Sequence, residues 1–299
     1  ARCEGAYAAT TLRGYRADLD VFIAWCGERA ATWLPADPAE VAAFLDGEAA
    51  RHRFSTVRRR LAAIGFAHRL GDLPDPSRHS EVRLALRRAM RRRARRVEQV
   101  VGLTHELRER ILAVCGDDRL GRRDAALIAV GYDTLCRSWE LAAMRVEHLE
   151  VDRDGVTSVL IPRSKSDIAG DGRLAYLSER TATLLDRWRF DAPITAGPLF
   201  RGLHAGKPRP AALDTRSIRR LIKRAARRAG LPEAVVAGLS GHSMRIGAAQ
   251  DMLTAGFDLL AIMPAGGWKP PEIVARYVEH AHTRAMHERR WRALGECPP

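Results

Sequence analysis

The stretch that decides the fold is Ser240-Gly241-His242-Ser243-Met244-Arg245-Ile246-Gly247-Ala248-Ala249. His242 and Arg245 stand three residues apart at the start of a predicted helix, so their side chains share one face. A helix N-terminus also presents free N–H groups to an anion, and the small residues around the pair allow another backbone to approach closely. His-x-x-Arg alone is a weak motif, but in this setting it indicates an anion-binding turn.

A second informative stretch lies downstream and runs Gly266-Gly267-Trp268-Lys269-Pro270-Pro271-Glu272-Ile273-Val274-Ala275-Arg276-Tyr277. The Trp268 indole is a fixed single N–H donor that can hold a phosphate oxygen. Tyr277 follows nine residues later in a predicted helix, where its hydroxyl can serve as a nucleophile. Each residue alone is more often ordinary packing, so only the combination with the first stretch is informative.

Three charged residues upstream complete the set. Arg137 follows an apolar helix, and Glu140 stands three residues later, within reach of the guanidinium. Lys165 lies in a predicted turn after a strand, where burial and nearby cations can make a lysine a general acid. The alternatives are a surface ion pair and a solvated lysine. Two arginines, a histidine, a lysine, a tryptophan donor and a tyrosine are the groups needed to attack a DNA phosphodiester without a metal.

The composition is strongly basic, with 50 Lys and Arg against 36 Asp and Glu and a net charge of +14. Only four of the basic residues are lysines, and arginine forks suit phosphate oxygens and guanine edges. This favours a nucleic-acid partner, although ribosome-like and other basic proteins share it. The five cysteines form no Cys-x-x-Cys pair, which indicates a reducing cytosol and argues against zinc. With no long apolar run and no signal peptide, we expect a cytoplasmic protein without a membrane span.

The pattern of elements predicts a mainly α protein of two domains. Residues 1–92 predict a bundle of four or five helices, with Asp37 capping one helix and Ser55 another. Seven arginines between positions 87 and 96 indicate a helix end and then a basic linker over 93–102, with a solvated surface helix as the alternative. Residues 103–299 predict mostly helices and a small antiparallel sheet, with a hairpin at Asp154-Gly155. Two separate helices are expected at the end, over 272–280 and 284–294.

In their order and spacing, these residues resemble the tyrosine site-specific recombinases of the phage integrase family. That family shows an Arg, a Lys, His-x-x-Arg, a His or Trp, and a Tyr along the chain. Here the matching residues are Arg137, Lys165, His242, Arg245, Trp268 and Tyr277. Trp268, where many members have histidine, points to one phage branch of the family. The resemblance covers nearly the whole chain.

The resemblance implies a mechanism by phosphoryl transfer. Tyr277 would form a 3′-phosphotyrosyl bond, and Lys165 would protonate the departing 5′-oxygen. The non-bridging oxygens would be neutralised by Arg137, Arg245, His242 and Trp268, with Glu140 supporting Arg137. No ATP, metal or other cofactor is implied.

The resemblance also implies partners. These are double-stranded DNA with inverted repeats around a short spacer, and three further copies of the chain in a synaptic tetramer assembled from monomers. The helix over 284–294 would couple the subunits by exchange between neighbours, with packing on its own domain as the alternative. Thr56, Arg58 and Arg59 on a major-groove helix, and Arg216 in the second domain, are the DNA-reading residues that it suggests. For each of them, contact with a phosphate is an equal alternative.

Three other functions share parts of this pattern. A type IB topoisomerase and a telomere resolvase use the same arginine, lysine and tyrosine chemistry, but the helical N-terminal bundle argues against both. A non-catalytic DNA-binding regulator could use the same scaffold. The presence of Arg137, Arg245 and Tyr277 argues against that reading. The sequence does not give the target site.

Overall fold

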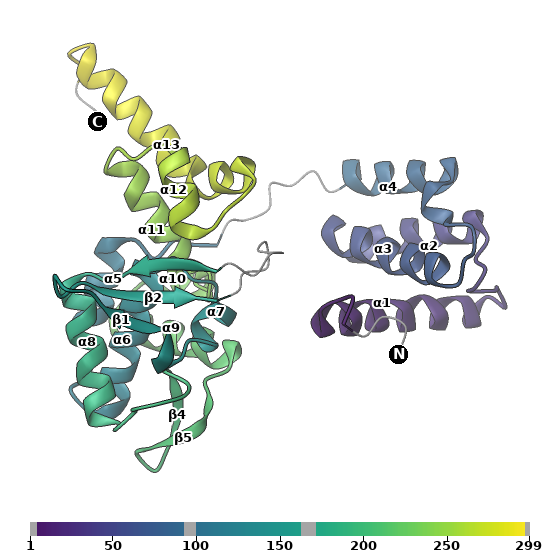
Figure 1. The fold of residues 1–299 in the computed structure, drawn as a ribbon. Coiled ribbons are helices and arrows are strands. Elements are labelled where there is room, and N and C mark those ends of the chain that lie inside the picture. The colour runs from purple at the N-terminus through teal and green to yellow at the C-terminus, as the bar shows by residue number, and fades with distance from the viewer. Residues whose placement is uncertain (1–4, 93–99, 163–171, 297–299) are drawn as a thin grey trace. The chain divides into compact units, whose positions relative to one another are not determined.

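The computed structural model describes residues 5–92, 100–162 and 172–296, without the side chains of 279–286 and 289. The chain divides into two compact units, Ala1–Val97 and Glu98–Pro299 (Figure 1). The mainly helical class with small antiparallel sheets is confirmed. The predicted linker falls mostly on residues 93–99, which lie outside the described residues.

The N-terminal unit is helical, and its elements are α1 (Ala9–Glu28), α2 (Pro38–Arg51), α3 (Phe54–Leu70), the 3-10 turn η1 (Pro76–Arg78) and α4 (Ser80–Arg92). Asp37 caps α2 as its sequence suggests, since its carboxylate accepts the Ala39 N–H at 2.8 Å. The expected cap at Ser55 is wrong. The helix begins earlier, at Phe54, because the Phe54 side chain packs against the core of this unit.

The C-terminal unit contains nine α-helices among its described residues. They are α5 (His105–Ala113), α6 (Arg119–Asp133), α7 (Ser138–Ala142), α8 (Glu179–Asp191), α9 (Thr215–Arg228), α10 (Glu233–Gly238), α11 (Ser243–Thr254), α12 (Leu259–Gly266) and α13 (Pro271–Ala293), with a 3-10 turn η2 (Val146–His148). The expectation of two final helices is wrong, because α13 is continuous. Neither Gly nor Pro occurs between 272 and 294 to interrupt it.

Two antiparallel sheets accompany these helices. The first has the order β1 (Leu149–Val151), β2 (Thr157–Ile161) and β3 (Arg173–Tyr176). Its first turn has Gly155 at φ +82°, so the predicted Asp-Gly hairpin is confirmed. The second sheet, β4 (Arg201–His204) with β5 (Lys207–Ala212), was not expected. Two prolines in β5 concealed it, because proline is tolerated only on sheet edges.

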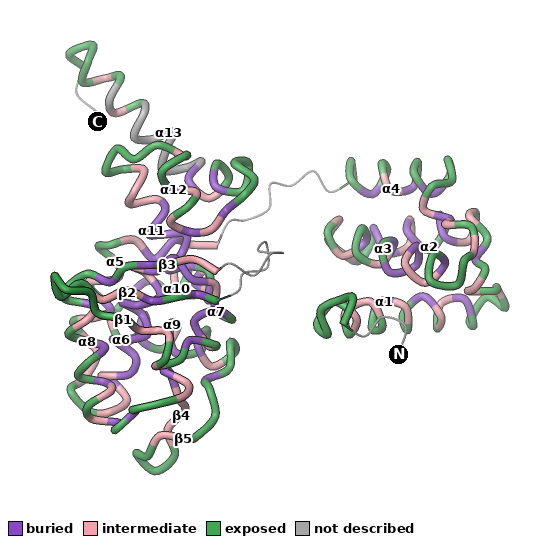
Figure 2. The backbone as a smooth tube through the Cα atoms, in the orientation of Figure 1, coloured by how far each residue is buried: buried purple, intermediate pink, exposed green. Residues whose placement is uncertain are grey.

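Each unit has its own apolar core (Figure 2). In the C-terminal unit the larger cluster joins α6, α8 and α9 to the three-stranded sheet and includes Leu127, Val159 and Trp188. A smaller cluster lies between α11, α12 and α13 and includes Ala249 and Val274. The smaller cluster matters most for function, because it holds the helix that carries Tyr277 against the helix that carries Arg245.

Candidate active site

Arg137 is held by the residue that the sequence pairs with it. The Glu140 carboxylate accepts the Arg137 backbone N–H at 2.8 Å and its Nη1 at 2.7 Å. The Glu140 side chain is fully buried, whereas 18% of the Arg137 side chain is exposed. Glu140 therefore holds the Arg137 guanidinium through Nη1, while part of the Arg137 side chain stays exposed to solvent. Charge-assisted bonds of this kind are among the stronger ones in proteins.

A glycine brings the His242 turn against the Arg137 turn. A Cβ placed on Gly241 would overlap the Ser138 Oγ, so no other residue allows this approach without displacement. His242 follows directly at the N-terminus of α11, and much of its ring surface is open. Desolvation by the surrounding protein, together with the Arg245 and Arg137 guanidiniums, lowers the pKa of His242. The ring is therefore neutral near pH 7, as a proton acceptor must be.

Arg245 lies almost completely buried at the centre of the site. Its Nη1 donates to the carbonyl oxygens of Leu135 and Gly266 at 2.5 and 2.7 Å. Its Nη2 is buried and makes no hydrogen bond within the described part of the chain. Burial, and next the Arg137 charge, lower the pKa of Arg245 to about 9, so the group stays protonated at pH 7. A buried cation with an unused donor is a binding site for an anion.

Trp268 stacks on Arg245 and lies beside Tyr277. The guanidinium carbon of Arg245 is 3.8 Å from the centre of the Trp268 ring, a cation–π contact. The Trp268 and Tyr277 ring centres are 6.1 Å apart. Trp268 is buried, and Tyr277 is half-buried above the small cluster under α13. The tryptophan therefore positions Arg245, a role that the sequence did not suggest.

The structure thus brings together six of the seven residues that the sequence nominates as catalytic. They are Arg137, Glu140, His242, Arg245, Trp268 and Tyr277, drawn from α7, α11, α13 and the turn after α12. Lys165 lies outside the described residues.

Sequence reasoning missed Arg173, at the start of β3. Its guanidinium donates to the carbonyl oxygens of Thr134 and Ala265 at 2.7 and 2.9 Å. These acceptors are the neighbours of Leu135 and Gly266, so two arginines bridge the same two turns side by side. Arg173 also donates to the Cys136 Sγ at 3.7 Å, and a strand residue whose other acceptors are backbone carbonyls leaves no motif in the sequence.

The nominated DNA-reading residues belong to other elements than the six grouped side chains. Thr56, Arg58 and Arg59 lie on α3 in the N-terminal unit, and Arg216 is exposed in the first turn of α9. Arg59 is held by the buried Asp18, whose carboxylate accepts its Nε at 2.6 Å and its Nη2 at 2.9 Å.

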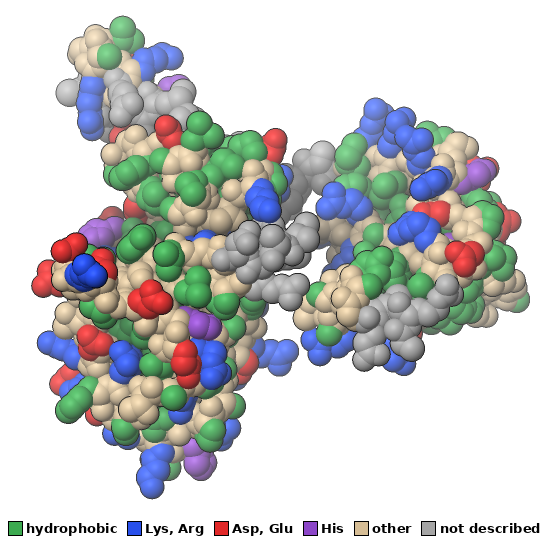
Figure 3. All heavy atoms as spheres, in the orientation of Figure 1, with side chains coloured by type: hydrophobic (Ala, Val, Ile, Leu, Met, Phe, Trp, Pro, Cys, Tyr) green, Lys and Arg blue, Asp and Glu red, His purple; other side chains and the backbone are tan. Residues whose placement is uncertain are grey.

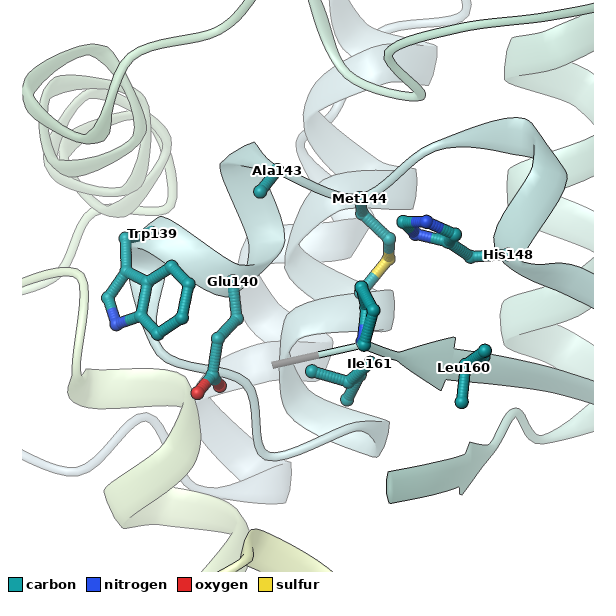
Figure 4. A pocket seen from close by; sticks show the side chains of 8 residues that line it. Trp139, Glu140, Ala143, Met144, His148, Leu160 and Ile161 are labelled. Atoms are coloured by element: carbon teal, nitrogen blue, oxygen red, sulfur yellow. The ribbon is translucent and has the colours of Figure 1, made fainter. Parts of the chain in front are cut away.

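A cavity of about 160 Å³ borders the site beside Glu140 (Figure 4). Its lining is mostly apolar and consists of Trp139, Glu140, Ala143, Met144, His148, Leu160, Ile161 and Pro162.

Among the residues with described positions, no three His, Cys, Asp or Glu side chains converge as metal ligands. In the same residues, no helix combines the length and apolarity that crossing a membrane requires.

Comparison with known proteins identifies the family to which this chain belongs. The model for the phage integrase family matches residues 102–284, and the model for the phage integrase N-terminal SAM-like domain matches residues 2–67. The chain belongs to the phage integrase family. It is therefore a tyrosine recombinase, an enzyme of site-specific DNA recombination.

The recombinase is similar to proteins from phage and bacteria. It is 31% identical to recombinase cre of Escherichia phage P1 over 285 residues, which is 88% of this chain and 82% of that protein. It is 30% identical to the tyrosine recombinase XerC of Xanthomonas axonopodis pv. citri, over 79% of this chain and 76% of that one. The Tn1549 transposon integrase, solved with transposon right-end DNA, shares its fold at a TM-score of 0.66, with 14% identity and 96% of each chain covered.

Proposed function

We propose that the recombinase cleaves and rejoins DNA strands through a covalent bond between Tyr277 and a 3′-phosphate. One observation carries the proposal: the buried Nη2 of Arg245 has no partner among the described residues, close to a tyrosine and a second arginine. A phosphodiester between Arg137, Arg245 and Tyr277 would accept that donor. Preorganised cations of this kind favour the extra negative charge of the transition state.

The proposed step exchanges one phosphate ester for another. The Tyr277 oxygen bonds to phosphorus as the bond from phosphorus to the 5′-oxygen breaks. The tyrosine proton passes toward neutral His242, and the 5′-oxygen gains a proton, in our proposal from Lys165. Attack by a 5′-hydroxyl of a partner strand reverses these changes. Because the number of ester bonds is unchanged, the cycle consumes no ATP, and its charge stabilisation comes from the side chains.

We further propose that the two units act together on one duplex. The exposed face of α9 is basic, with Arg216, Arg219 and Arg220 opposite a buried apolar face. Lys and Arg side chains also gather on the N-terminal unit over α4 (Figure 3). Fixed positive charge on helices suits phosphate contacts. On this proposal, inverted repeats around a short spacer bind two copies, and two such sites form a tetramer.

Trapping the intermediate tests the proposed chemistry. Nicked duplexes with inverted repeats of about a dozen base pairs, taken from the genomic neighbourhood of the gene, are incubated with the recombinase and EDTA. A denaturing gel should show a protein–DNA band that protease removes and that Tyr277→Phe lacks while still binding DNA. A band that persists in Tyr277→Phe, or one that EDTA abolishes, would refute the mechanism. Mass measurement of the DNA-bound assembly tests the tetramer.

A further inference from the structure

The segment Val101–Thr104, which includes the last two residues of the predicted linker, runs along α11. Leu103 donates its N–H to the Ser243 carbonyl at 2.7 Å, and Val101 donates to the Gly238 carbonyl at 3.1 Å. A Cβ on Gly247 would overlap the Leu103 carbonyl oxygen. The segment is therefore fixed by backbone contacts against the helix that carries Arg245.

One side chain on α11 touches both this segment and the Tyr277 backbone. A Cβ on Gly102 would overlap the Gln250 Oε1, so the Gln250 amide lies directly against the segment. The Nε2 of the same amide donates to the Tyr277 carbonyl oxygen at 3.1 Å. A carbonyl oxygen has two lone pairs, so it can accept this bond as well as the bond of its own helix.

This bond constrains a motion that the apolar contacts leave open. Val274 and Val278 bury one face of α13 in the small cluster, and apolar packing is not directional. The apolar packing therefore fixes the distance between α13 and α11 firmly, but it fixes the rotation of α13 about its own axis less firmly. A hydrogen bond to the Tyr277 carbonyl is directional and acts at the residue whose oxygen must face phosphorus. A displacement of about 1 Å at a reacting group can cost about a hundredfold in rate.

We propose that Gln250 is a positioning residue for strand cleavage, joining the Tyr277 backbone to Gly102 at the start of the C-terminal unit. The inference rests on the proposed role of Tyr277 as nucleophile. On this proposal, a single amide holds the Tyr277 backbone in register with the Val101–Thr104 segment.

The first test replaces the amide by groups of the same length. Covalent adduct formation is followed in single turnover at saturating nicked half-site, and the Kd for the half-site is measured separately. Gln250→Met keeps the length and loses the donor, and about a tenfold slower cleavage is expected from one lost hydrogen bond. Gln250→Glu presents a carboxylate to the carbonyl oxygen and should be slower still. The Kd should change less than about twofold for both, since neither touches DNA in this scheme. Cleavage by Gln250→Met at the wild-type rate would overturn the proposal.

The second test uses a double-mutant cycle between Gly102 and Gln250. Gly102→Ala should slow cleavage by displacing the amide. The same change in a Gln250→Ala background should have a much smaller effect, since only the Gly247 N, 3.1 Å from the added Cβ, remains close. Additive losses would show that the two residues act independently and would overturn the coupling. Thermal melting of each variant separates these effects from misfolding. The wild type and Tyr277→Phe are run alongside: no wild-type adduct refutes the proposed function, whereas normal adduct rates in every Gln250 variant refute only this inference.

Discussion

Replacement of Glu140 by glutamine tests the electrostatic design of the site. The carboxylate is fully buried and makes two bonds to Arg137, with the buried Arg245 and the exposed His242 close by. Removing one partner of a buried pair costs about 3–5 kcal/mol, and the remaining amide oxygen keeps one acceptor, so we expect the lower end. In a unit of about 200 residues, each kcal/mol shifts Tm by about 2–4 °C. Glu140→Gln should therefore lower Tm by about 6–12 °C.

Scanning calorimetry with and without half-site DNA checks the prediction. A bound phosphate supplies the negative charge that the variant lacks, so DNA should stabilise Glu140→Gln more than the wild type. Glu233→Gln is the matched control, since Glu233 also accepts two bonds from one arginine, Arg227, but is exposed; its Tm should barely change. A Glu140→Gln melt within about 2 °C of the wild type, or equal stabilisation of both by DNA, would refute this account of Arg137.

Three further predictions follow from the site and its surroundings. Because the pKa of His242 is lowered, the cleavage rate should decline at a lower pH than an ordinary histidine would give. A pH–rate profile in which His242→Gln keeps the same acid limb would contradict the assignment. Gly241→Ala forces the new methyl into Ser138 and should reduce cleavage at least about tenfold with little change in DNA affinity; Gly47→Ala, which has open space around it, should have no effect. Arg216→Ala should relax base preference at one position of the site, and a uniform loss of affinity across sequences would identify a phosphate contact instead.

The fold class followed from local signals in the sequence. Helical periodicity, the Asp37 cap and the Asp-Gly turn act over a few residues, so they predict α2 and the first hairpin correctly. The start of α3 was missed because Phe54 packs against core residues from other helices, and the local sequence pattern does not show those contacts. The break expected within α13 had no residue to cause it. The second sheet was missed because its proline-containing strand has weak local propensity.

For the candidate site, the sequence nominated side chains that lie together, but it did not indicate what holds them in place. The order of charged and aromatic residues nominated Arg137, Arg245 and Tyr277, which the fold brings together. Their supports are long-range: Arg173 bonds to carbonyl oxygens 39 and 92 residues away, and Arg59 bonds to Asp18, 41 residues away. Such contacts exist only once the tertiary structure has formed, and a backbone carbonyl acceptor has no sequence signature. The Gln250 contact is of the same kind.

Because α13 is continuous, movement at its C-terminal end is transmitted to Tyr277. Tyr277 lies in its second turn, and sixteen residues follow it to Ala293, an arm of about 24 Å at 1.5 Å per residue. A tilt that moves the C-terminal end of α13 by a few ångströms rotates the helix by only a few degrees. The displacement of the Tyr277 hydroxyl is therefore smaller than the displacement at the end of the helix. If Tyr277 is the nucleophile, as we propose, a partner bound at the far end of α13 would adjust the position of its hydroxyl finely. A rigid binder that restrains this end of α13 should therefore slow the proposed reaction.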